Sequence, residues 1–293
     1  MQFIGVLTAL VTPFRNMSVD EEAYRNHIEW QIEQGIHGMV PCGTTGESAT
    51  LSHDEHKQVI NICVDQVKGR VPVLAGAGSN NTTESIELAK HAKRAGADGL
   101  LLITPYYNKP TQEGLIAHYR AISAAVKMPC VLYNVPSRTS LNLLPTTVAR
   151  IAWKIPEVVG IKEATGDLKQ VSEIVESCPP GFQVISGDDF TILPILAVGG
   201  CGVISVVSNI VPALVISLYN AFTVSDLVRA RQVHYELSPL SRAMFIETNP
   251  ASVKTALALM GRMQPDLRLP LVALTQANTE NLKQILDSIG LLT

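Results

Sequence analysis

Short runs of hydrophobic residues alternate with longer amphipathic stretches along most of this chain. The short runs are rich in β-branched residues, which is typical of buried strands. They predict eight strands, at Val6–Val11, Gly38–Pro41, Val71–Ala75, Gly99–Ile103, Cys130–Tyr133, Val158–Lys162, Gln183–Ser186 and Gly202–Val206. Helical patterns lie between most of them, so the alternation predicts parallel β-α-β units.

Several predicted helices begin with residues that favour a helix start. Ser52 is followed three positions later by Glu55, which matches a capping box. Thr82 and Thr111 begin further helical stretches in a similar way, and Pro145 suits the first turn of another. These signals support helices between the predicted strands.

Eight such units in roughly 250 residues are the size of a (β/α)8 TIM barrel. The predicted organisation is a catalytic barrel over residues 1-222 and a C-terminal helical region over residues 223-293. Helical patterns at Val224–Leu240, Ser252–Met260 and Thr275–Ile289 make up that region. No Ser/Gly/Pro linker precedes it, so we expect it to pack on the barrel.

An open, doubly wound sheet is the alternative fold. Its phosphate-binding fingerprint, GxGxxG after a first strand, is absent, because Gly76-Ala77-Gly78 stops short of it. The lack of a phosphate loop also argues against a nucleotide as substrate or cofactor.

Composition sets further bounds. Hydrophobic residues make up 46% of the 293 residues and charged residues 17%, which is ample for a large core. The formal net charge of −3 gives no electrostatic reason to expect binding to nucleic acid or to an anionic membrane. No apolar run is long enough to span a bilayer.

The five cysteines are scattered and form no CxxC pair, so neither a disulfide framework nor a structural zinc site is expected. Reduced thiols are typical of the cytoplasm. The first residues lack the basic segment of a secretory signal. The predicted location is therefore cytoplasmic.

Lys162 is the most informative single residue. It ends the predicted strand Val158–Lys162, which places an amine at the edge of the core. Burial disfavours the ammonium form of lysine, and a neutral amine can attack a carbonyl carbon to form an imine. The alternative is a solvated lysine where a strand meets water.

Other polar residues follow predicted strands at their carboxyl ends, where barrel enzymes carry their catalytic groups. Thr44 and Thr45 lie in a glycine-flanked turn that can present N–H groups and hydroxyls to a carboxylate. Tyr133 can transfer protons, and Arg138 can bind a second carboxylate. The alternatives are a helix-capping turn, a tyrosine at the rim and a surface ion pair. Their convergence around Lys162 favours a Schiff-base enzyme for a small carboxylated carbonyl compound, with no metal or other cofactor.

Three motifs carry a family resemblance. They are Gly43-Thr44-Thr45-Gly46-Glu47-Ser48, Tyr133-Asn134-Val135-Pro136-Ser137-Arg138-Thr139 and Gly160-Ile161-Lys162-Glu163-Ala164. In this order they resemble the dihydrodipicolinate synthases, bacterial class I aldolase-type lyases in the superfamily of the N-acetylneuraminate lyases. The resemblance runs from Gly5 to the C-terminus. It implies condensation of pyruvate with L-aspartate 4-semialdehyde to 4-hydroxy-tetrahydrodipicolinate, the first committed step to diaminopimelate and lysine, in a homotetramer built as a dimer of dimers.

The resemblance also implies residue roles. Lys162 attacks the keto carbon of pyruvate. Tyr133 relays protons in a triad with Thr45 and Tyr107, the last of which reaches in from a neighbouring subunit. The implied substrate-binding residues are Thr44 and Thr45 for the pyruvate carboxylate, Arg138 for the aldehyde's carboxylate, and Gly187 and Ile204 through main-chain contacts.

A second site is implied as well, at which L-lysine inhibits the enzyme. Seven residues match the types that surround lysine in inhibited synthases: Ser48, Ala49, His53, His56, Asn80, Glu84 and Tyr106. Glu84 provides a charge for the lysine amino group. The alternative for the two histidines is a helix face in solvent.

Two further functions remain as alternatives. One is another pyruvate-dependent class I aldolase, of the N-acetylneuraminate lyase or 2-oxo acid aldolase type. The sialic acid enzymes usually read Gly-Ser-Thr-Gly-Glu and lack the arginine, so Thr44 and Arg138 favour the synthase. The other is a non-catalytic barrel that binds a small carboxylate. A missing lysine or tyrosine would mark that function, and Lys162 and Tyr133 are both present.

Overall fold

The computed structural model describes residues 2–292, which form one eight-stranded parallel sheet and a small antiparallel sheet that the sequence did not predict. The large sheet contains β1 (Gly5–Ala9), β4 (Gly38–Val40), β5 (Leu74–Gly76), β6 (Gly99–Ile103), β7 (Cys130–Asn134), β8 (Val158–Glu163), β9 (Gln183–Ser186) and β10 (Gly202–Ser205). The small sheet pairs β2 (Phe14–Arg15) with β3 (Ser18–Val19). All eight predicted strands are confirmed, with the largest boundary shift at β5.

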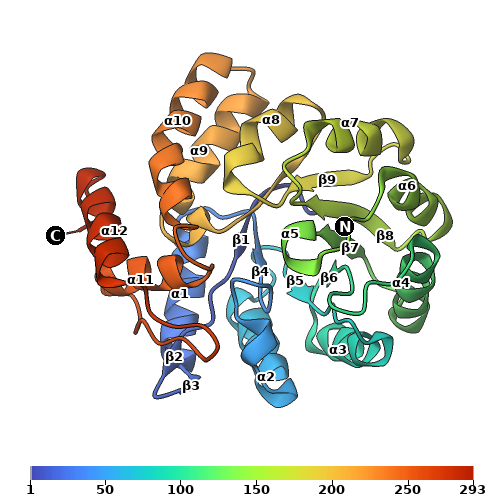
Figure 1. Ribbon diagram of the computed structural model, residues 1–293, viewed down its shortest axis with the longest axis horizontal. Coiled ribbons are helices and arrows are strands. Elements are labelled where there is room, and N and C mark those ends of the chain that lie inside the picture. Colours follow the sequence, from blue (N-terminus) through green and yellow to red (C-terminus); the bar gives the residue numbers. More distant parts are fainter. Residues whose placement is uncertain (1, 293) are drawn as a thin grey trace.

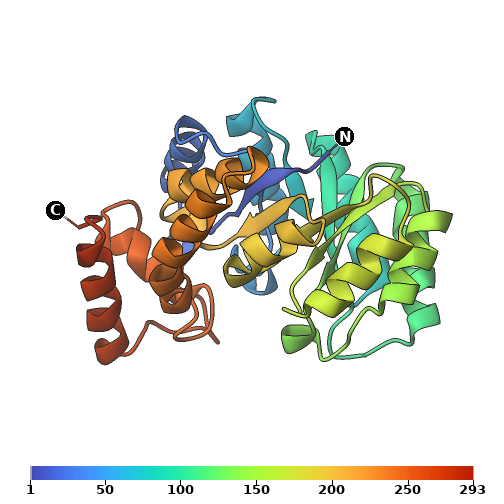
Figure 2. The same cartoon turned by 90° about the horizontal axis from the view of Figure 1, so that it is seen from above.

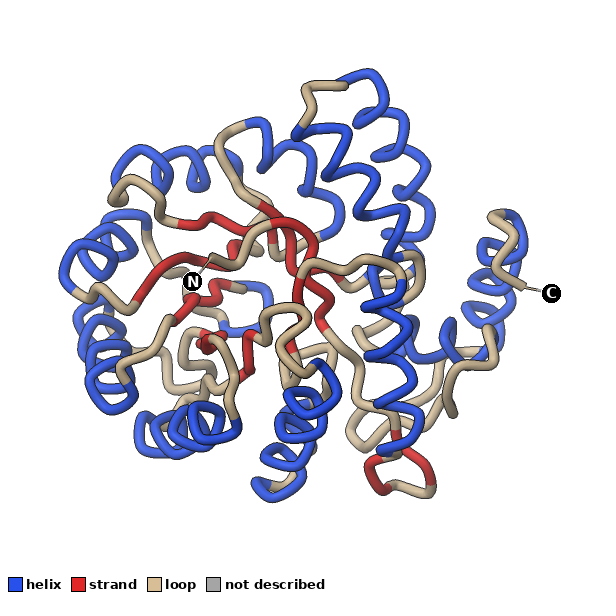
Figure 3. The backbone as a smooth tube through the Cα atoms, turned by 180° about the vertical axis from the view of Figure 1, so that it is seen from behind, coloured by secondary structure: helices blue, strands red, loops and turns tan. Residues whose placement is uncertain are grey.

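The large sheet closes on itself. Its hydrogen-bonded order is β4-β1-β10-β9-β8-β7-β6-β5, and a parallel bridge between Met39 and Val73 joins the two ends. The strands lie at the centre of a ring of helices (Figure 1, Figure 3). The predicted TIM barrel is therefore confirmed, and the alternative of an open sheet is wrong.

Alternation along each strand divides the core into two layers. In β7, Val131 and Tyr133 belong to a small cluster drawn almost entirely from strands, whereas Leu132 belongs to the large cluster that includes the helices. Successive side chains of a strand point to opposite faces, so the small cluster fills the barrel interior. Tyr133 therefore points into the barrel.

Eight helices precede the C-terminal segment within the described residues. They are α1 (Glu21–Glu33), α2 (His53–Val67), α3 (Thr82–Ala95), α4 (Gln112–Val126), α5 (Pro136–Thr139), α6 (Pro145–Lys154), α7 (Leu168–Ser177) and α8 (Ile192–Ala197). The Ser52–Glu55 capping box and the first-turn Pro145 are confirmed. Asn81 caps α3, one residue before the predicted start.

The C-terminal segment forms α9 (Pro212–Thr223), α10 (Leu227–Ala243), α11 (Ala251–Leu259) and α12 (Gln276–Ser288). The three predicted helical runs after residue 223 are thus confirmed as helices. Figure 2 shows α10 beside α9, and α12 at the far end from the strands. Leu282 and Leu286 of α12 are fully buried. The division between residues 222 and 223 stays a prediction, because α9 packs on β1 as well as on α10.

Within residues 2–292, no helix is long and apolar enough to cross a membrane, and no three His, Cys, Asp or Glu side chains are grouped as metal ligands. The five cysteines are free thiols. Burial raises the pKa of Cys63, Cys130 and Cys201 to about 12, so these thiols stay protonated at neutral pH.

Candidate active site

A cavity of about 500 Å³ lies at the carboxyl ends of β4, β5, β6 and β7. Three of the predicted catalytic and substrate-binding residues line it, namely Thr44, Tyr133 and Arg138. The C-terminal region contributes Thr248 and Asn249 to the same wall. This is the edge at which barrel enzymes carry their catalytic groups, so the cavity is the candidate active site.

Lys162 does not line this cavity itself, but it contacts Tyr133, which does. The two residues are register partners in β8 and β7, and the Lys162 Nζ lies 4.3 Å from the centre of the Tyr133 ring. Lys162 is only 6% exposed. The alternative of a solvated lysine at a strand end is therefore wrong.

The next residue along β8 points the other way. Glu163 is fully buried and accepts hydrogen bonds from the side chains of Asn134 and Gln170, each at 3.0 Å, and from the Thr165 N–H at 2.8 Å. Gln170 belongs to α7, outside the barrel. These contacts fix the end of β8 from the outside and leave Lys162 directed inward.

The turn after β4 leaves some of its N–H groups without a hydrogen-bond acceptor in the part of the chain that the structure describes. The N–H groups of Gly46 and Ser48 both donate to the carbonyl of Gly43, and the Glu47 N–H donates to the carbonyl of Thr44. Within residues 2–292, the N–H groups of Thr44 and Thr45 have no such partner. Both groups can bind a carboxylate.

Arg138 lies in α5, immediately after β7. Its side chain is exposed, lines the cavity and makes no ion pair within residues 2–292. The alternative of a surface ion pair is therefore wrong. A guanidinium without a carboxylate partner at the mouth of a cavity is suited to an anionic ligand.

Gly187 and Ile204 do not line the cavity. A methyl group at Gly187 would lie 2.6 Å from the Cβ of Ala164, so β8 and β9 can approach only because this residue is glycine. The Gly187 N–H donates to the Glu163 carbonyl at 2.8 Å. Its carbonyl is therefore the group left for a ligand. Ile204 is fully buried in β10.

Tyr107 is not brought to the other triad residues within the chain. It is 90% exposed and does not line the cavity, whereas Thr45 and Tyr133 are buried. The described chain alone therefore does not assemble the predicted triad of Tyr133, Thr45 and Tyr107.

Comparison with known proteins places this geometry in a family. Residues 2–289 match the Dihydrodipicolinate synthetase family. The chain is 68% identical over 291 residues to a 4-hydroxy-tetrahydrodipicolinate synthase from Oleidesulfovibrio alaskensis, covering 99% of this chain and 100% of the relative. The chain belongs to the dihydrodipicolinate synthetase family. The predicted lyase activity, that of a 4-hydroxy-tetrahydrodipicolinate synthase of lysine and diaminopimelate biosynthesis, is thereby confirmed.

Two solved structures of the family are informative about ligands. A dihydrodipicolinate synthase from Acinetobacter baumannii, complexed with pyruvate, has a TM-score of 0.96 and 42% identity, covering 99% of this chain and 100% of that one. A family structure from Cyanidioschyzon merolae with lysine bound has a TM-score of 0.95 and 39% identity, covering 99% of each chain. The folds therefore superpose over nearly their whole length.

In the present chain, most of the predicted lysine-binding residues line the same cavity as the candidate active site. Those that line it are Ser48, Ala49, His53, His56, Glu84 and Tyr106. Asn80 does not line it, although its neighbour Ser79 does. The carbonyl of Asn80 accepts a hydrogen bond from the Asn108 side chain at 2.9 Å.

The charged group of this second region is Glu84. The Ser79 hydroxyl donates to it, and the His53 Nε2 lies 2.6 Å from its Oε1. These contacts, that of Ser79 first, lower the pKa of Glu84, so its carboxylate is ionised at neutral pH. His56 is only 6% exposed, and burial lowers its pKa. The alternative of a helix face in solvent is therefore wrong for His56. For His53 it holds only in that the ring is exposed.

Sequence reasoning missed the contribution of the C-terminal region. Asn249 donates to Thr45, and Lys254 pairs with Glu47 across more than 200 residues. An Asn-Pro pair before a helix was the only local signal, and it carries no information about a partner so distant in sequence. Asp189, which follows β9 and does not line the cavity, accepts a hydrogen bond from the Ser205 hydroxyl at 2.5 Å, and burial raises its pKa to about 6.

Proposed function

We propose that Lys162 forms a Schiff base with pyruvate and that the chain condenses this adduct with L-aspartate 4-semialdehyde. The observation that carries the proposal is the buried Lys162 amine over the ring of Tyr133, beside a cavity with two carboxylate-binding groups. The Acinetobacter baumannii relative complexed with pyruvate supports the choice of the first substrate.

The reaction needs proton transfers at each step. The neutral amine of Lys162 adds to the keto carbon, and loss of water gives an iminium that withdraws electrons from the neighbouring methyl carbon. Loss of a methyl proton then gives an enamine, which attacks the aldehyde carbon and forms the new C–C bond. Tyr133 is within reach of Lys162 and supplies a proton to the aldehyde oxygen. The amine of the semialdehyde finally displaces Lys162 and closes the ring.

Two groups bind the two carboxylates. The N–H groups of Thr44 and Thr45 and the Thr44 hydroxyl receive the pyruvate carboxylate, because these N–H groups are not used within the turn. Arg138 receives the carboxylate of the semialdehyde, since a guanidinium binds a carboxylate through two parallel hydrogen bonds. The carbonyls of Gly187 and Ile204 complete the site. This second carboxylate distinguishes the synthase from the alternative aldolases.

Tyr107 completes the proton relay in a neighbouring subunit. Its high exposure in the single chain leaves it available to a partner. The assembly that we propose is a homotetramer, a dimer of dimers, in the cytoplasm. The pairing of two chains around the active site is the part of this assembly on which activity depends.

L-Lysine inhibits the enzyme at the second region of the cavity. The ionised Glu84 binds the lysine amino group, and Ser48, His53, His56 and Tyr106 surround it together with Ala49 and Asn80. The Cyanidioschyzon merolae relative with lysine bound supports this proposal.

The test of the Schiff base is intact-mass measurement after borohydride treatment with pyruvate. Wild type is expected to gain one reduced pyruvate adduct, and Lys162→Ala none. An unmodified wild type would overturn the mechanism. Turnover of L-aspartate 4-semialdehyde, compared with that of sugar acids and 4-hydroxy-2-oxo acids, separates the synthase from the other aldolases.

A further inference from the structure

Two contacts join the C-terminal region to the turn after β4. The Asn249 Nδ2 donates to the Thr45 Oγ1 at 3.1 Å, and the Lys254 Nζ lies 2.6 Å from the Glu47 Oε1. All four residues are buried. Asn249 and Lys254 stand on either side of the first residues of α11, so one short segment contacts two positions of the turn.

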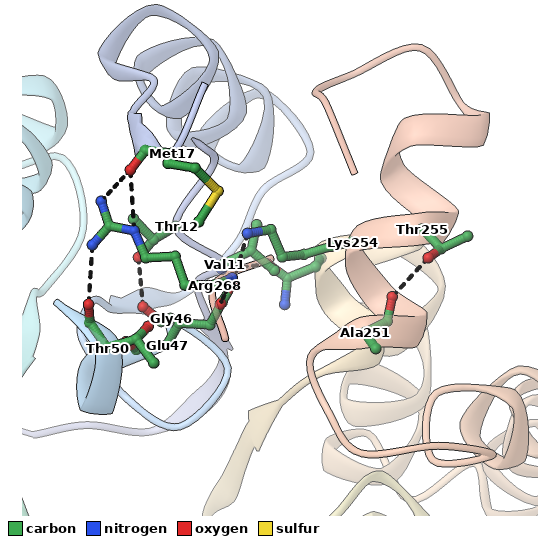
Figure 4. Close-up of polar contacts among 11 residues, drawn as sticks. Val11, Thr12, Met17, Gly46, Glu47, Thr50, Ala251, Lys254, Thr255 and Arg268 are labelled. Carbon is green, nitrogen blue, oxygen red and sulfur yellow. Dashed lines mark hydrogen bonds and ion pairs between the residues drawn. The ribbon is translucent and has the colours of Figure 1, made fainter. Parts of the chain in front are cut away.

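The contact between Lys254 and Glu47 is an ion pair with no solvent exposure at either side chain. The other oxygen of Glu47 accepts the Arg268 N–H at 3.2 Å, and the Lys254 Nζ also lies 4.1 Å from the centre of the Phe14 ring. Figure 4 shows Lys254 and Arg268 reaching the turn from the C-terminal region. The Gly46 carbonyl accepts the Thr12 hydroxyl at 2.7 Å, which fixes the turn on the side of β1.

Stability alone does not account for this arrangement. A well-packed apolar pair commonly stabilises a core as much as a buried ion pair does, whereas an ion pair fixes one geometry. Glu47 also has a left-handed backbone, with a φ of 53°, which a glutamate rarely adopts. The Oδ1 of Asn249 is buried without a hydrogen-bond partner within residues 2–292, which costs stability.

The hydrogen bond from Asn249 restricts the direction in which the Thr45 hydroxyl can donate its proton. A threonine hydroxyl has one proton to donate and lone pairs that accept. Because the amide nitrogen of Asn249 can only donate, the Thr45 oxygen accepts on that side, and its own proton is directed elsewhere. In the proposed triad, Tyr133 receives it.

We propose that Asn249 is a positioning residue that directs the Thr45 hydroxyl proton toward Tyr133, and that the Glu47–Lys254 pair holds the turn in place for this contact. The C-terminal region is then part of the catalytic apparatus, although none of its residues need touch the reacting atoms. The inference rests on the proposed role of Thr45 in proton transfer.

The test is a double-mutant cycle in kcat with Asn249→Ala, Thr45→Val and their combination. Asn249→Ala is expected to lower kcat about tenfold, the effect of one lost hydrogen bond. In the Thr45→Val background the same change is expected to have no further effect, because the hydroxyl that it orients is gone. A multiplicative loss in the double variant would overturn the proposal.

Further variants separate positioning from folding. Asn249→Asp keeps the shape but loses the donor, and it is expected to lower kcat at least as much as Asn249→Ala. Asn278→Ala is the matched control: its Nδ2 donates to Glu247 at 2.7 Å, away from the turn, and kcat is expected to stay at the wild-type value. Wild-type kcat in Asn249→Asp would overturn the proposal. Wild-type kcat in Thr45→Val would instead remove the role of Thr45 itself.

The ion pair is tested by comparing melting temperature with kcat. Lys254→Met leaves the Glu47 carboxylate buried and unpaired, so both values are expected to fall. Adding Glu47→Gln removes that charge, and it is expected to restore the melting temperature but to leave kcat at least about tenfold below wild type. Restoration of both values would overturn a positioning role for the pair.

Discussion

Lys162 and Tyr133 face each other across neighbouring parallel strands, with the amine nitrogen 4.3 Å from the centre of the phenol ring. Both side chains point into the barrel because of the alternation along β8 and β7. The amine nitrogen lies over the face of the ring. The same register therefore presents a nucleophile and a proton donor to one substrate.

This relationship separates the role of the Tyr133 ring from that of its hydroxyl. Tyr133→Phe keeps the ring under the amine, so the borohydride-trapped pyruvate adduct is still expected to form. Loss of the hydroxyl is expected to lower kcat about 10²- to 10⁴-fold, the usual contribution of general acid–base catalysis. Steady-state kinetics and intact mass measure the two effects. Tyr235→Phe, at an exposed position of α10, is the control, and an unchanged kcat in Tyr133→Phe would contradict the proton-transfer role.

Arg138 is expected to act on the second substrate only. Arg138→Ala removes the partner of the semialdehyde carboxylate, and KM for the semialdehyde is expected to rise about 10- to 100-fold because a charged hydrogen bond is lost. The yield of pyruvate adduct is expected to stay the same. Arg120→Ala, which removes an exposed arginine from α4, is the matched control. A rise in KM for pyruvate alone would contradict the assignment.

The strands, the helices and the inward lysine follow from local patterns, so the sequence predicted them. An apolar run that ends in lysine places the amine at a strand end, and the closed barrel brings the strand ends together. The contacts of Asn249 and Lys254 with the turn depend instead on how α11 docks, and docking has no local pattern. Local patterns do not fix the exposure of Tyr107 either, because the same tyrosine in the same loop can face its own barrel or a partner; only the family resemblance implied a place in a neighbouring subunit.

The response to lysine is expected to depend on the charge of Glu84. Glu84→Gln keeps the shape of the side chain but removes the ionised oxygen, so the lysine concentration for half-inhibition is expected to rise about tenfold or more. Inhibition curves with lysine measure this. Glu87→Gln lies one turn along α3 at an exposed position and is expected to keep the wild-type curve. Equal curves for Glu84→Gln and wild type would remove the proposed site.

Two buried histidines are expected to make the fold sensitive to mild acid. Burial lowers the pKa of His27 and of His118 to about 4, from the ordinary value near 6.5. Between pH 6.5 and 4 the unfolded chain therefore binds protons that the folded chain does not, and stability falls by up to about 1.4 kcal/mol per pH unit for each histidine. Above pH 6.5 the two histidines are neutral in both the folded and the unfolded chain, so they do not make stability depend on pH.

Urea unfolding between pH 7 and pH 4 measures this loss. His118→Asn has no imidazole to protonate in the unfolded chain. The pH dependence of its unfolding free energy is therefore expected to correspond to the uptake of about one proton fewer than in wild type. His27→Asn is expected to behave in the same way. Identical pH dependence in wild type and both variants would show that other groups control acid unfolding.

The exposed Tyr107 gives a prediction about assembly. If it serves the site of a neighbouring chain, Tyr107→Phe and Tyr133→Phe each damage every site of their own homo-oligomer. A mixed pair of chains, however, contains one site with both tyrosines intact, because the Tyr133→Phe chain donates its Tyr107 to the partner. Dissociating the two variants and reassociating them together is expected to restore up to about a quarter of wild-type activity, since half of randomly formed pairs are mixed and each has one intact site of two. Reassociating each variant alone is the control. Activity that does not rise on mixing would mean that Tyr107 acts within its own chain or not at all. Action within its own chain would require a rearrangement of the loop that follows β6, because Tyr107 is 90% exposed there.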